Sequence, residues 1–222
     1  MTPREVVRQL NALIGNLIEL GLSESQNHPS ERRDPSGSLE ISFNGAERVT
    51  AALKNQPYKT IYDQLVSAQA YSVKMPDGAL IQMSYRFTGE GLTGHRLAFF
   101  PSPYLEDFQN EPEIYEADEV FADIVAKSVV PFPVRFDFDS DGQRFEELNH
   151  PMSHLTLGQF KNCRIPVSAP LTPFQFLNFV LRNFYNTVHR SYANEMLVCA
   201  GSFADTIVGT ESEVVHIRVG GG

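Results

Sequence analysis

The chain has 222 residues, of which 42% are hydrophobic and 20% are charged, and its formal net charge is −9. This length favours one domain over residues 1–222, since domains commonly hold about 100–200 residues. No apolar run reaches the roughly 18 residues that a membrane-spanning helix needs, and the first residues lack the apolar centre of a secretory signal. Cys163 and Cys199 fit no C-x-x-C motif. We therefore expect a cytoplasmic protein with free thiols.

The net negative charge argues against sequence-independent binding to nucleic acid, which needs Lys and Arg to displace counterions. The charge is, however, unevenly distributed. Residues 101–147 carry thirteen carboxylates against Lys127, Arg135 and Arg144, whereas residues 149–194 carry no carboxylate, four cations and three histidines. The two segments either neutralise each other in the fold or leave a local anion-binding face on an acidic protein.

The clearest predicted element is a helix over residues 2–20. Thr2 and Glu5 fit a T-x-x-E capping box, and Pro3 occupies the first helical position. Apolar residues then recur at three- and four-residue steps, and a glycine at position 21 provides a left-handed stop. The polar segment 23–38 holds two prolines and a glycine, so we expect a mobile loop there.

Several short elements are predicted after this loop. In chain order they are a strand at 39–43, helices near 46–54 and 60–68, a hairpin of residues 71–75 and 79–87, and a strand at 95–100. The hairpin is indicated by Pro76, Asp77 and Gly78, which are typical turn residues. The last three strands should form a meander.

The second half of the chain is predicted to hold further strands and one long helix. In order, we expect a helix at 120–127, strands at 129–138, 153–157 and 163–167, a helix at 172–189, strands at 196–199 and 214–219, and a glycine tail at 220–222 that should fray. Thr172, Pro173 and Gln175 repeat the start signals of the first helix. Together these elements predict an α+β fold, in which a mainly antiparallel sheet packs against an N-terminal and a C-terminal helix.

The densest polar cluster lies at the end of the strand at 129–138. Because side chains alternate along a strand, Arg135, Asp137 and Asp139 should project together from one face. His150 and His154 follow after a loop and could return to the same place.

Three interpretations of this cluster stay open. Residues 137–142 match the first half of a calcium-binding loop, but the twelfth position is Leu148 and no helix precedes the loop. Alternatively, His150, His154 and one carboxylate bind zinc or another transition metal, although Pro151 prevents a regular helical H-x-x-x-H site. In the third interpretation the cluster is structural, with arginine–aspartate ion pairs and histidines that hydrogen-bond the backbone.

For function, we expect a non-catalytic binding or accessory module without a cofactor. Its binding face would meet an anionic small molecule or a partner protein through Arg135, His150, His154, Lys161 and Arg164. The alternative is a metal-dependent hydrolase, in particular a nuclease, whose divalent metal would be held by Asp137, Asp139, His150 and His154. No Walker A loop, G-x-G-x-x-G fingerprint or G-x-S-x-G elbow occurs, which argues against a nucleotide cofactor and a serine hydrolase.

Several short motifs also point to a known family. They are F-P-S-P at 100–103, R-F-D-F-D at 135–139, H-P-M-S-H at 150–154 with L-G at 157–158, C-R-I-P at 163–166, and L-T-P at 171–173 leading to F-Y at 184–185. In these motifs the chain resembles domain-of-unknown-function family 2290, over most of its length after residue 38. The resemblance implies a bacterial origin and a place among genes of phage defence or mobile elements, and it assigns no activity and no catalytic residue.

Overall fold

The N-terminal helix forms where its capping residues predict it. The computed structural model describes residues 1–43, 56–89, 91–160 and 162–220. Helix α1 spans Pro3–Glu19. The Thr2 hydroxyl accepts a hydrogen bond from the Glu5 N–H at 3.4 Å, and the Glu5 carboxylate accepts one from the Thr2 N–H at 2.7 Å, which confirms the capping box. Gly21 follows with a φ of 70°, the left-handed conformation that ends the helix.

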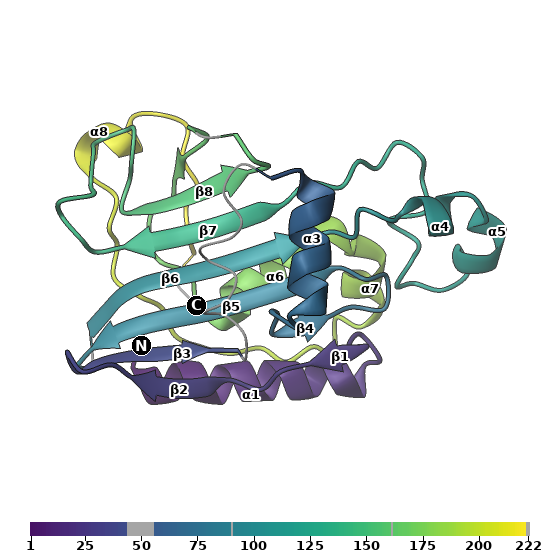
Figure 1. The fold of residues 1–222 in the computed structure, drawn as a ribbon, viewed down its shortest axis with the longest axis horizontal. Helices are drawn as coiled ribbons and strands as arrows, with labels where there is room; N and C mark the ends of the chain where they lie inside the picture. The colour runs from purple at the N-terminus through teal and green to yellow at the C-terminus, as the bar shows by residue number, and fades with distance from the viewer. Residues whose placement is uncertain (44–55, 90, 161, 221–222) are drawn as a thin grey trace.

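The strands form one nine-stranded antiparallel sheet (Figure 1). They are β1 (Ser25–Gln26), β2 (Ser30–Arg33), β3 (Ser38–Ser42), β4 (Val73–Lys74), β5 (Leu80–Thr88), β6 (Gly91–Phe100), β7 (Val134–Asp139), β8 (Ser153–Leu157) and β9 (Ile165–Pro166). Their spatial order is β1-β4-β5-β6-β7-β8-β9, and the β2–β3 hairpin joins through β3 to β5. The predicted strands at 39–43, 95–100 and 153–157 and the hairpin at 71–87 are confirmed within a few residues.

One face of this sheet packs against α1 and α6 (Pro173–Phe184) and forms the main core. Helix α6 begins with the second predicted capping box, between Thr172 and Gln175. Apolar side chains from both helices and from the central strands are almost fully buried between them, for example Ile14, Tyr85, Phe99, Phe136 and Phe176. The predicted α+β single domain, with an antiparallel sheet against an N-terminal and a C-terminal helix, is therefore confirmed.

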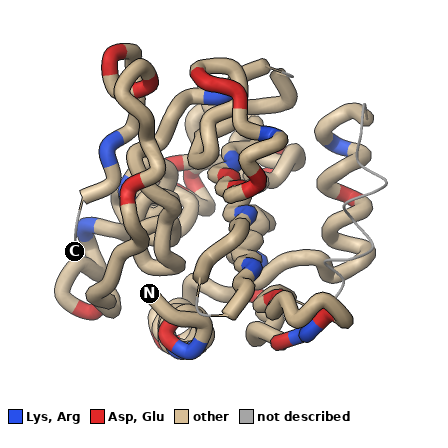
Figure 2. The backbone as a smooth tube through the Cα atoms, turned by 90° about the vertical axis from the view of Figure 1, so that its left-hand side faces the viewer, with Lys and Arg blue, Asp and Glu red and all other residues tan. Residues whose placement is uncertain are grey.

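Helix α3 (Tyr58–Ser67) covers part of the opposite face, as Figure 1 shows. Its buried residues Ile61, Tyr62 and Leu65 form a smaller apolar cluster with Leu80 of β5. In the view of Figure 2 this helix stands on one side of the sheet, away from the C-terminal segments on the other side. The part of this face formed by β6, β7 and β8 carries polar side chains.

Residues 23–38 were expected to be a loop, and the structure instead forms β1 and β2 there. Strand β1 pairs with β4, and β2 forms a hairpin with β3. In the turn of this hairpin the Asp34 N–H donates to the Ser38 carbonyl at 3.0 Å, and Gly37 has a φ of 86°. The polar sequence of β2 is explained by its position, because all four of its residues are exposed.

The region between β6 and β7 also differs from the prediction. Residues 120–127 form turns, and the short helices α4 (Glu106–Gln109) and α5 (Pro112–Tyr115) lie upstream of them. The strand expected from residue 129 begins only at Val134. The two prolines before this position have no N–H to donate to a sheet, which explains the late start.

Two strands expected near the C-terminus do not form. At residues 196–199 the Leu197 N–H donates to the Asn16 side chain of α1 at 2.8 Å instead of to another strand. At residues 214–219 Ile217 makes a single isolated bridge with Val167. A short helix, α8 (Gly209–Ser212), separates these two segments.

The long helix expected at 172–189 is divided at Tyr185 into α6 and α7 (Asn186–Ser191). The helix expected near 46–54 and the last two glycines of the tail lie outside the described residues.

Both cysteines are free and half-buried. None of the described helices is long and apolar enough to cross a membrane.

Candidate functional site

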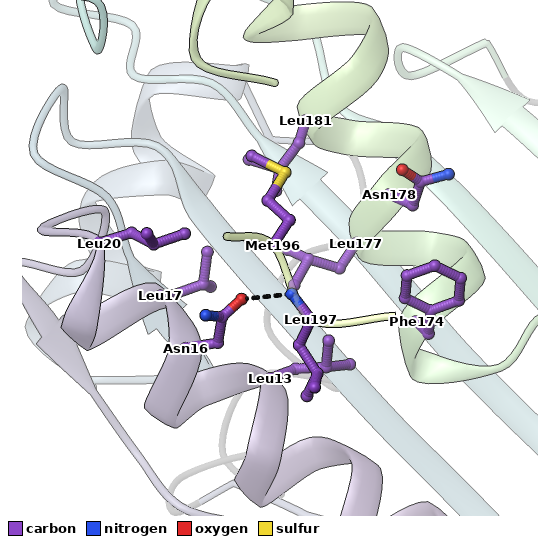
Figure 3. Close-up of a pocket in the computed structure, with 10 residues that line it drawn as sticks. All are labelled: Leu13, Asn16, Leu17, Leu20, Phe174, Leu177, Asn178, Leu181, Met196 and Leu197. Atoms are coloured by element: carbon purple, nitrogen blue, oxygen red, sulfur yellow. Dashed lines mark hydrogen bonds between the residues drawn. The ribbon is translucent and has the colours of Figure 1, made fainter. Parts of the chain in front are cut away.

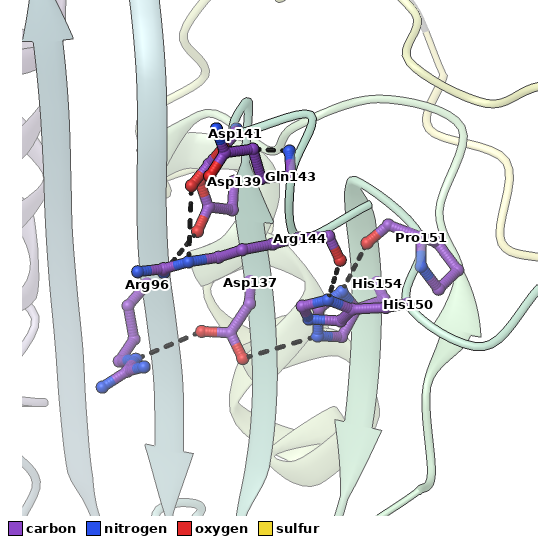
Figure 4. Close-up of polar contacts among 9 residues, drawn as sticks. All are labelled: Arg96, Asp137, Asp139, Asp141, Gln143, Arg144, His150, Pro151 and His154. Carbon is purple, nitrogen blue, oxygen red and sulfur yellow. Dashed lines mark hydrogen bonds and ion pairs between the residues drawn. The ribbon is translucent and has the colours of Figure 1, made fainter. Parts of the chain in front are cut away.

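The predicted alternation along β7 places the polar cluster on the face of the sheet opposite the main core. Val134, Phe136 and Phe138 are buried, whereas the intervening Arg135, Asp137 and Asp139 are partly exposed. On the neighbouring strands, Arg96 of β6 and His154 of β8 are both paired in register with Asp137. A row of charged and titratable side chains therefore crosses three strands (Figure 4).

Asp137 lies at the centre of this row and is held by two guanidinium groups. The Arg96 Nε donates to its Oδ1 at 3.1 Å, and the Arg135 Nε donates to its Oδ2. Burial by itself would raise the pKa of Asp137, but the positive charges of Arg135 and Arg96 outweigh it and lower this pKa below its usual value. Asp137 is therefore an ionised carboxylate whose two oxygens are both occupied.

His154 closes the row on the side of β8. Its Nδ1 lies 2.9 Å from the Pro151 carbonyl, to which it donates, and its Nε2 lies 3.9 Å from the Asp137 Oδ2. Burial lowers the pKa of His154, and the positive charges of His150 and Arg164 lower it further. The imidazole is therefore neutral at physiological pH, and it packs against the His150 ring with the ring centroids 5.3 Å apart.

Two further predicted residues lie at the edge of this row. The His150 Nδ1 is 2.5 Å from the Arg144 carbonyl. The Arg164 guanidinium donates to the Asn149 carbonyl at 3.2 Å, close enough to the histidines to affect the pKa of His154. Lys161, the remaining residue of the predicted binding face, lies outside the described part of the chain.

Asp139 is not part of this group. Its carboxylate pairs with Arg144 at 2.9 Å, and Arg144 also reaches Asp141 at 3.5 Å. The carboxylates of the predicted calcium loop thus face an arginine, and among the described residues no group of three or more histidine, cysteine, aspartate or glutamate side chains could hold a metal ion. Of the three interpretations, the ion-pair arrangement accounts for these contacts best.

The two charge segments do not neutralise each other through ion pairs. Over the described ranges, only the contact of His154 with Asp137 joins a basic side chain of residues 149–194 to a carboxylate of residues 101–147, and the neutral imidazole cancels no charge there. Figure 2 shows basic and acidic residues interleaved along the chain in that view. The basic stretch therefore keeps positive charge that its acidic neighbour does not cancel.

Comparison with known protein families gives one match. A family profile described as "Uncharacterized conserved protein (DUF2290)" matches residues 22–219. The chain belongs to the DUF2290 family. This match confirms the resemblance seen in the short motifs, and it covers the whole polar row. No curated protein and no solved structure matches the chain.

One hollow elsewhere in this DUF2290 protein is too small to be a ligand site. It lies between α1, α6 and the segment at Met196 and Leu197, and its walls are mostly leucine side chains (Figure 3). Its volume of about 30 Å³ is comparable to the share of one water molecule in the liquid. The polar row on β6–β8 is therefore the better candidate site.

The sequence did not identify two members of this candidate site. Arg96 was assigned to a strand but not to the site, because only the register of β6 against β7 brings it to Asp137. Thr156 of β8 lies opposite Arg135 and two residues beyond His154, on the same face. The alternation rule could have found Thr156 once β8 was known to pair with β7.

Proposed function

We propose that this protein is a binding module that recognises an anionic group at a cationic patch on the outer face of its sheet. The cationic patch consists of the arginines Arg96, Arg135 and Arg164 together with the neighbouring imidazoles of His150 and His154. The anionic group would belong to a small molecule or to a partner protein. No step of catalysis is required of these residues.

The observation that carries this proposal is the excess of positive charge around one carboxylate. The guanidinium groups of Arg96 and Arg135 contact Asp137, and that of Arg164 lies near His154, so Asp137 can compensate only one of the three positive charges. The side chains of Arg96 and Arg135 are 48% and 40% exposed, and both contact Asp137 through Nε. Within the described residues their terminal nitrogens make no hydrogen bond. These nitrogens are donors that remain available to an anion.

The same contacts argue against the metal-dependent hydrolase. A ligand carboxylate must be free to bind the metal, whereas Asp137 accepts hydrogen bonds from two arginines and Asp139 from a third. The predicted ligands therefore point to different partners instead of converging on one position. Anion binding uses the arrangement as it stands.

The proposal is tested by NMR titration of the ¹⁵N-labelled protein with pyrophosphate and with citrate. Both anions should shift the amide resonances of β6, β7 and β8. The double variant Arg135→Gln/Arg164→Gln should bind at least about tenfold more weakly, because a hydrogen bond to a charged group contributes roughly 1.5–3 kcal/mol. Arg182→Gln is the matched control, since it removes one exposed arginine from α6 and should leave binding unchanged.

Two results would contradict the proposal. One is that neither anion shifts the amides of these three strands. The other is that the double variant, still folded by its circular dichroism, binds both anions as tightly as the unmodified protein does.

A further inference from the structure

One buried hydroxyl beside the cationic patch has no hydrogen-bond partner. Thr156 is only 8% exposed, and its Oγ1 is buried without a partner among the described residues. An unpaired buried hydroxyl costs free energy, so buried polar groups without partners are rare in folded proteins. Three other side-chain atoms share this property, on Ser42, His95 and Glu211, but they lie on β3, on the core face of β6 and in α8.

The position of Thr156 links its hydroxyl to the patch. Thr156 is paired in register with Arg135 across β7 and β8. It also lies on the same face as His154, two residues earlier on β8. An unsatisfied donor therefore lies next to two members of the cationic patch.

We infer that the anionic group recognised by this patch is a phosphoryl group, and that the Thr156 hydroxyl donates a hydrogen bond to one of its oxygens. This inference rests on the proposed function and names its ligand class. It gives the unpaired hydroxyl a partner that only the bound state supplies.

The directions of the donors favour a phosphoryl group over a carboxylate. A phosphate monoester presents three acceptor oxygens that point in different directions. The patch offers donors from separate elements: Arg96 on β6, Arg135 on β7, Thr156 on β8 and Arg164 just before β9. A carboxylate has only two oxygens, which lie in one plane. The carboxylate of Asp137 already occupies this position in the protein, with one guanidinium group on each of its oxygens.

The charge balance agrees with this assignment. Three guanidinium groups and one carboxylate leave two positive charges uncompensated beside the neutral His154. A phosphate monoester carries about −1.5 to −2 at pH 7. The bound complex would therefore be close to neutral.

Access to Thr156 requires one local movement. Because its hydroxyl is covered in the free protein, we place the movement at Arg135, whose side chain is 40% exposed and lies directly across the strand pair. The Arg135 guanidinium would turn from Asp137 towards the phosphoryl group, and Arg96 would continue to hold the carboxylate.

The test compares two dianions of similar size by isothermal titration calorimetry at pH 7.5. The probes are phenyl phosphate, which offers a tetrahedral oxyanion, and phthalate, which offers two carboxylates. The unmodified protein should bind phenyl phosphate at least fivefold more tightly than phthalate. Thr156→Val should weaken phenyl phosphate binding about fivefold to tenfold and leave phthalate binding unchanged, because it removes one donor hydroxyl at constant shape. Thr156→Ser keeps the hydroxyl and should bind phenyl phosphate like the unmodified protein.

Thermal unfolding of the ligand-free variants provides an independent measurement. Because the hydroxyl is unpaired in the free protein, Thr156→Val should melt at the same temperature as the unmodified protein or at a higher one. A lower melting temperature would show that the hydroxyl has a structural partner and would overturn the inference.

The other outcomes separate the inference from the proposal beneath it. Equal binding of both dianions, or unchanged phenyl phosphate binding in Thr156→Val, would overturn the phosphoryl assignment and leave anion binding intact. No binding of either dianion, together with no response to pyrophosphate or citrate, would overturn both.

Discussion

Asp77 lies in the turn between β4 and β5, and it is a carboxylate buried to 3% exposure. The Tyr185 hydroxyl donates to its Oδ2 at 2.6 Å, and the Ala79 N–H donates to its Oδ1 at 3.1 Å. Burial raises the pKa of Asp77 to about 6, although these two hydrogen bonds act in the opposite direction. At neutral pH the fold therefore carries an ionised buried carboxylate at a cost in stability.

This cost predicts a specific pH dependence of unfolding. Because the folded pKa is raised, the folded state binds the proton more tightly than the unfolded state, in which the pKa is near 3.8. The stabilising contribution of protonated Asp77 to the free energy of unfolding is fully present below the unfolded pKa near 3.8 and is lost as the pH rises through about 6. The loss amounts to roughly 3 kcal/mol, since each pKa unit corresponds to 1.36 kcal/mol.

The Asp77→Asn variant isolates this contribution, because other carboxylates titrate alike in both proteins. Urea unfolding at pH 4 and at pH 7.5 should show that the unmodified protein loses roughly 2.5 kcal/mol more than the variant over this range. Parallel pH profiles for the two proteins would mean that Asp77 keeps an ordinary pKa in the fold.

Among the secondary-structure elements, the β4–β5 turn depends on a single glycine. Gly78 has a φ of 87°, and a Cβ at this position would lie 3.0 Å from the Tyr62 hydroxyl and 3.3 Å from Ser102. The Tyr62 hydroxyl donates to the Gly78 carbonyl at 2.6 Å, so the same turn also anchors α3 to the sheet. Both the backbone conformation and the space around Gly78 exclude a larger residue.

Gly78→Ala should therefore destabilise the protein by about 2–3 kcal/mol, of which roughly 1–2 kcal/mol comes from the left-handed backbone alone. Gly37→Ala is the matched control. Gly37 has a φ of 86° but no atom within 4 Å of its Cβ position, so it should show the backbone cost only. If chemical denaturation shows equal decreases in the free energy of unfolding for Gly78→Ala and Gly37→Ala, the contact with Tyr62 is unimportant.

The extended segment after α7 depends on side chains of α1. The Asn16 Oδ1 accepts a hydrogen bond from the Leu197 N–H at 2.8 Å (Figure 3). The Asn16 Nδ2 donates to the Glu195 carbonyl at 3.1 Å. Two polar contacts of one helical residue thus replace the strand pairing that the apolar sequence at 196–199 had suggested.

Asn16→Ala should release this segment without unfolding α1, because alanine is a good helix former. Hydrogen exchange at the Leu197 amide should become about tenfold faster, since a hydrogen bond contributes roughly 0.5–1.5 kcal/mol. Asn11→Ala, on the same helix, should leave this amide unaffected. Unchanged exchange in Asn16→Ala would contradict the proposed role of Asn16.

The elements show where sequence reasoning succeeds and where it stops. Local signals located α1 and α6, because a capping box is a contact between residues three positions apart. The alternation along β7 likewise assigned Arg135 and Asp137 to one face. In contrast, Arg96 and Thr156 enter the site only through strand pairing over long sequence distances, which no local pattern contains.

For the molecule as a whole, the carboxylates around α4 and α5 form a surface separate from the cationic patch. Figure 1 shows α4 and α5 projecting from one end of the sheet. Seven exposed carboxylates lie there, and no described ion pair involves any of them: Glu106, Asp107, Glu111, Glu113, Glu116, Asp118 and Glu119. The net charge of −9 thus sums these carboxylates with the arginines of the cationic patch, and the proposed anion would approach the patch against the average charge of the protein.

The most direct test of this account is the NMR titration of the ¹⁵N-labelled protein with pyrophosphate, carried out in parallel on the Arg135→Gln/Arg164→Gln variant. We expect saturable shifts confined to amides of β6, β7 and β8 in the unmodified protein, and binding at least about tenfold weaker in the variant. Shifts that are absent, spread over the whole surface, or identical in the two proteins would contradict the assignment of an anion-binding site to this face.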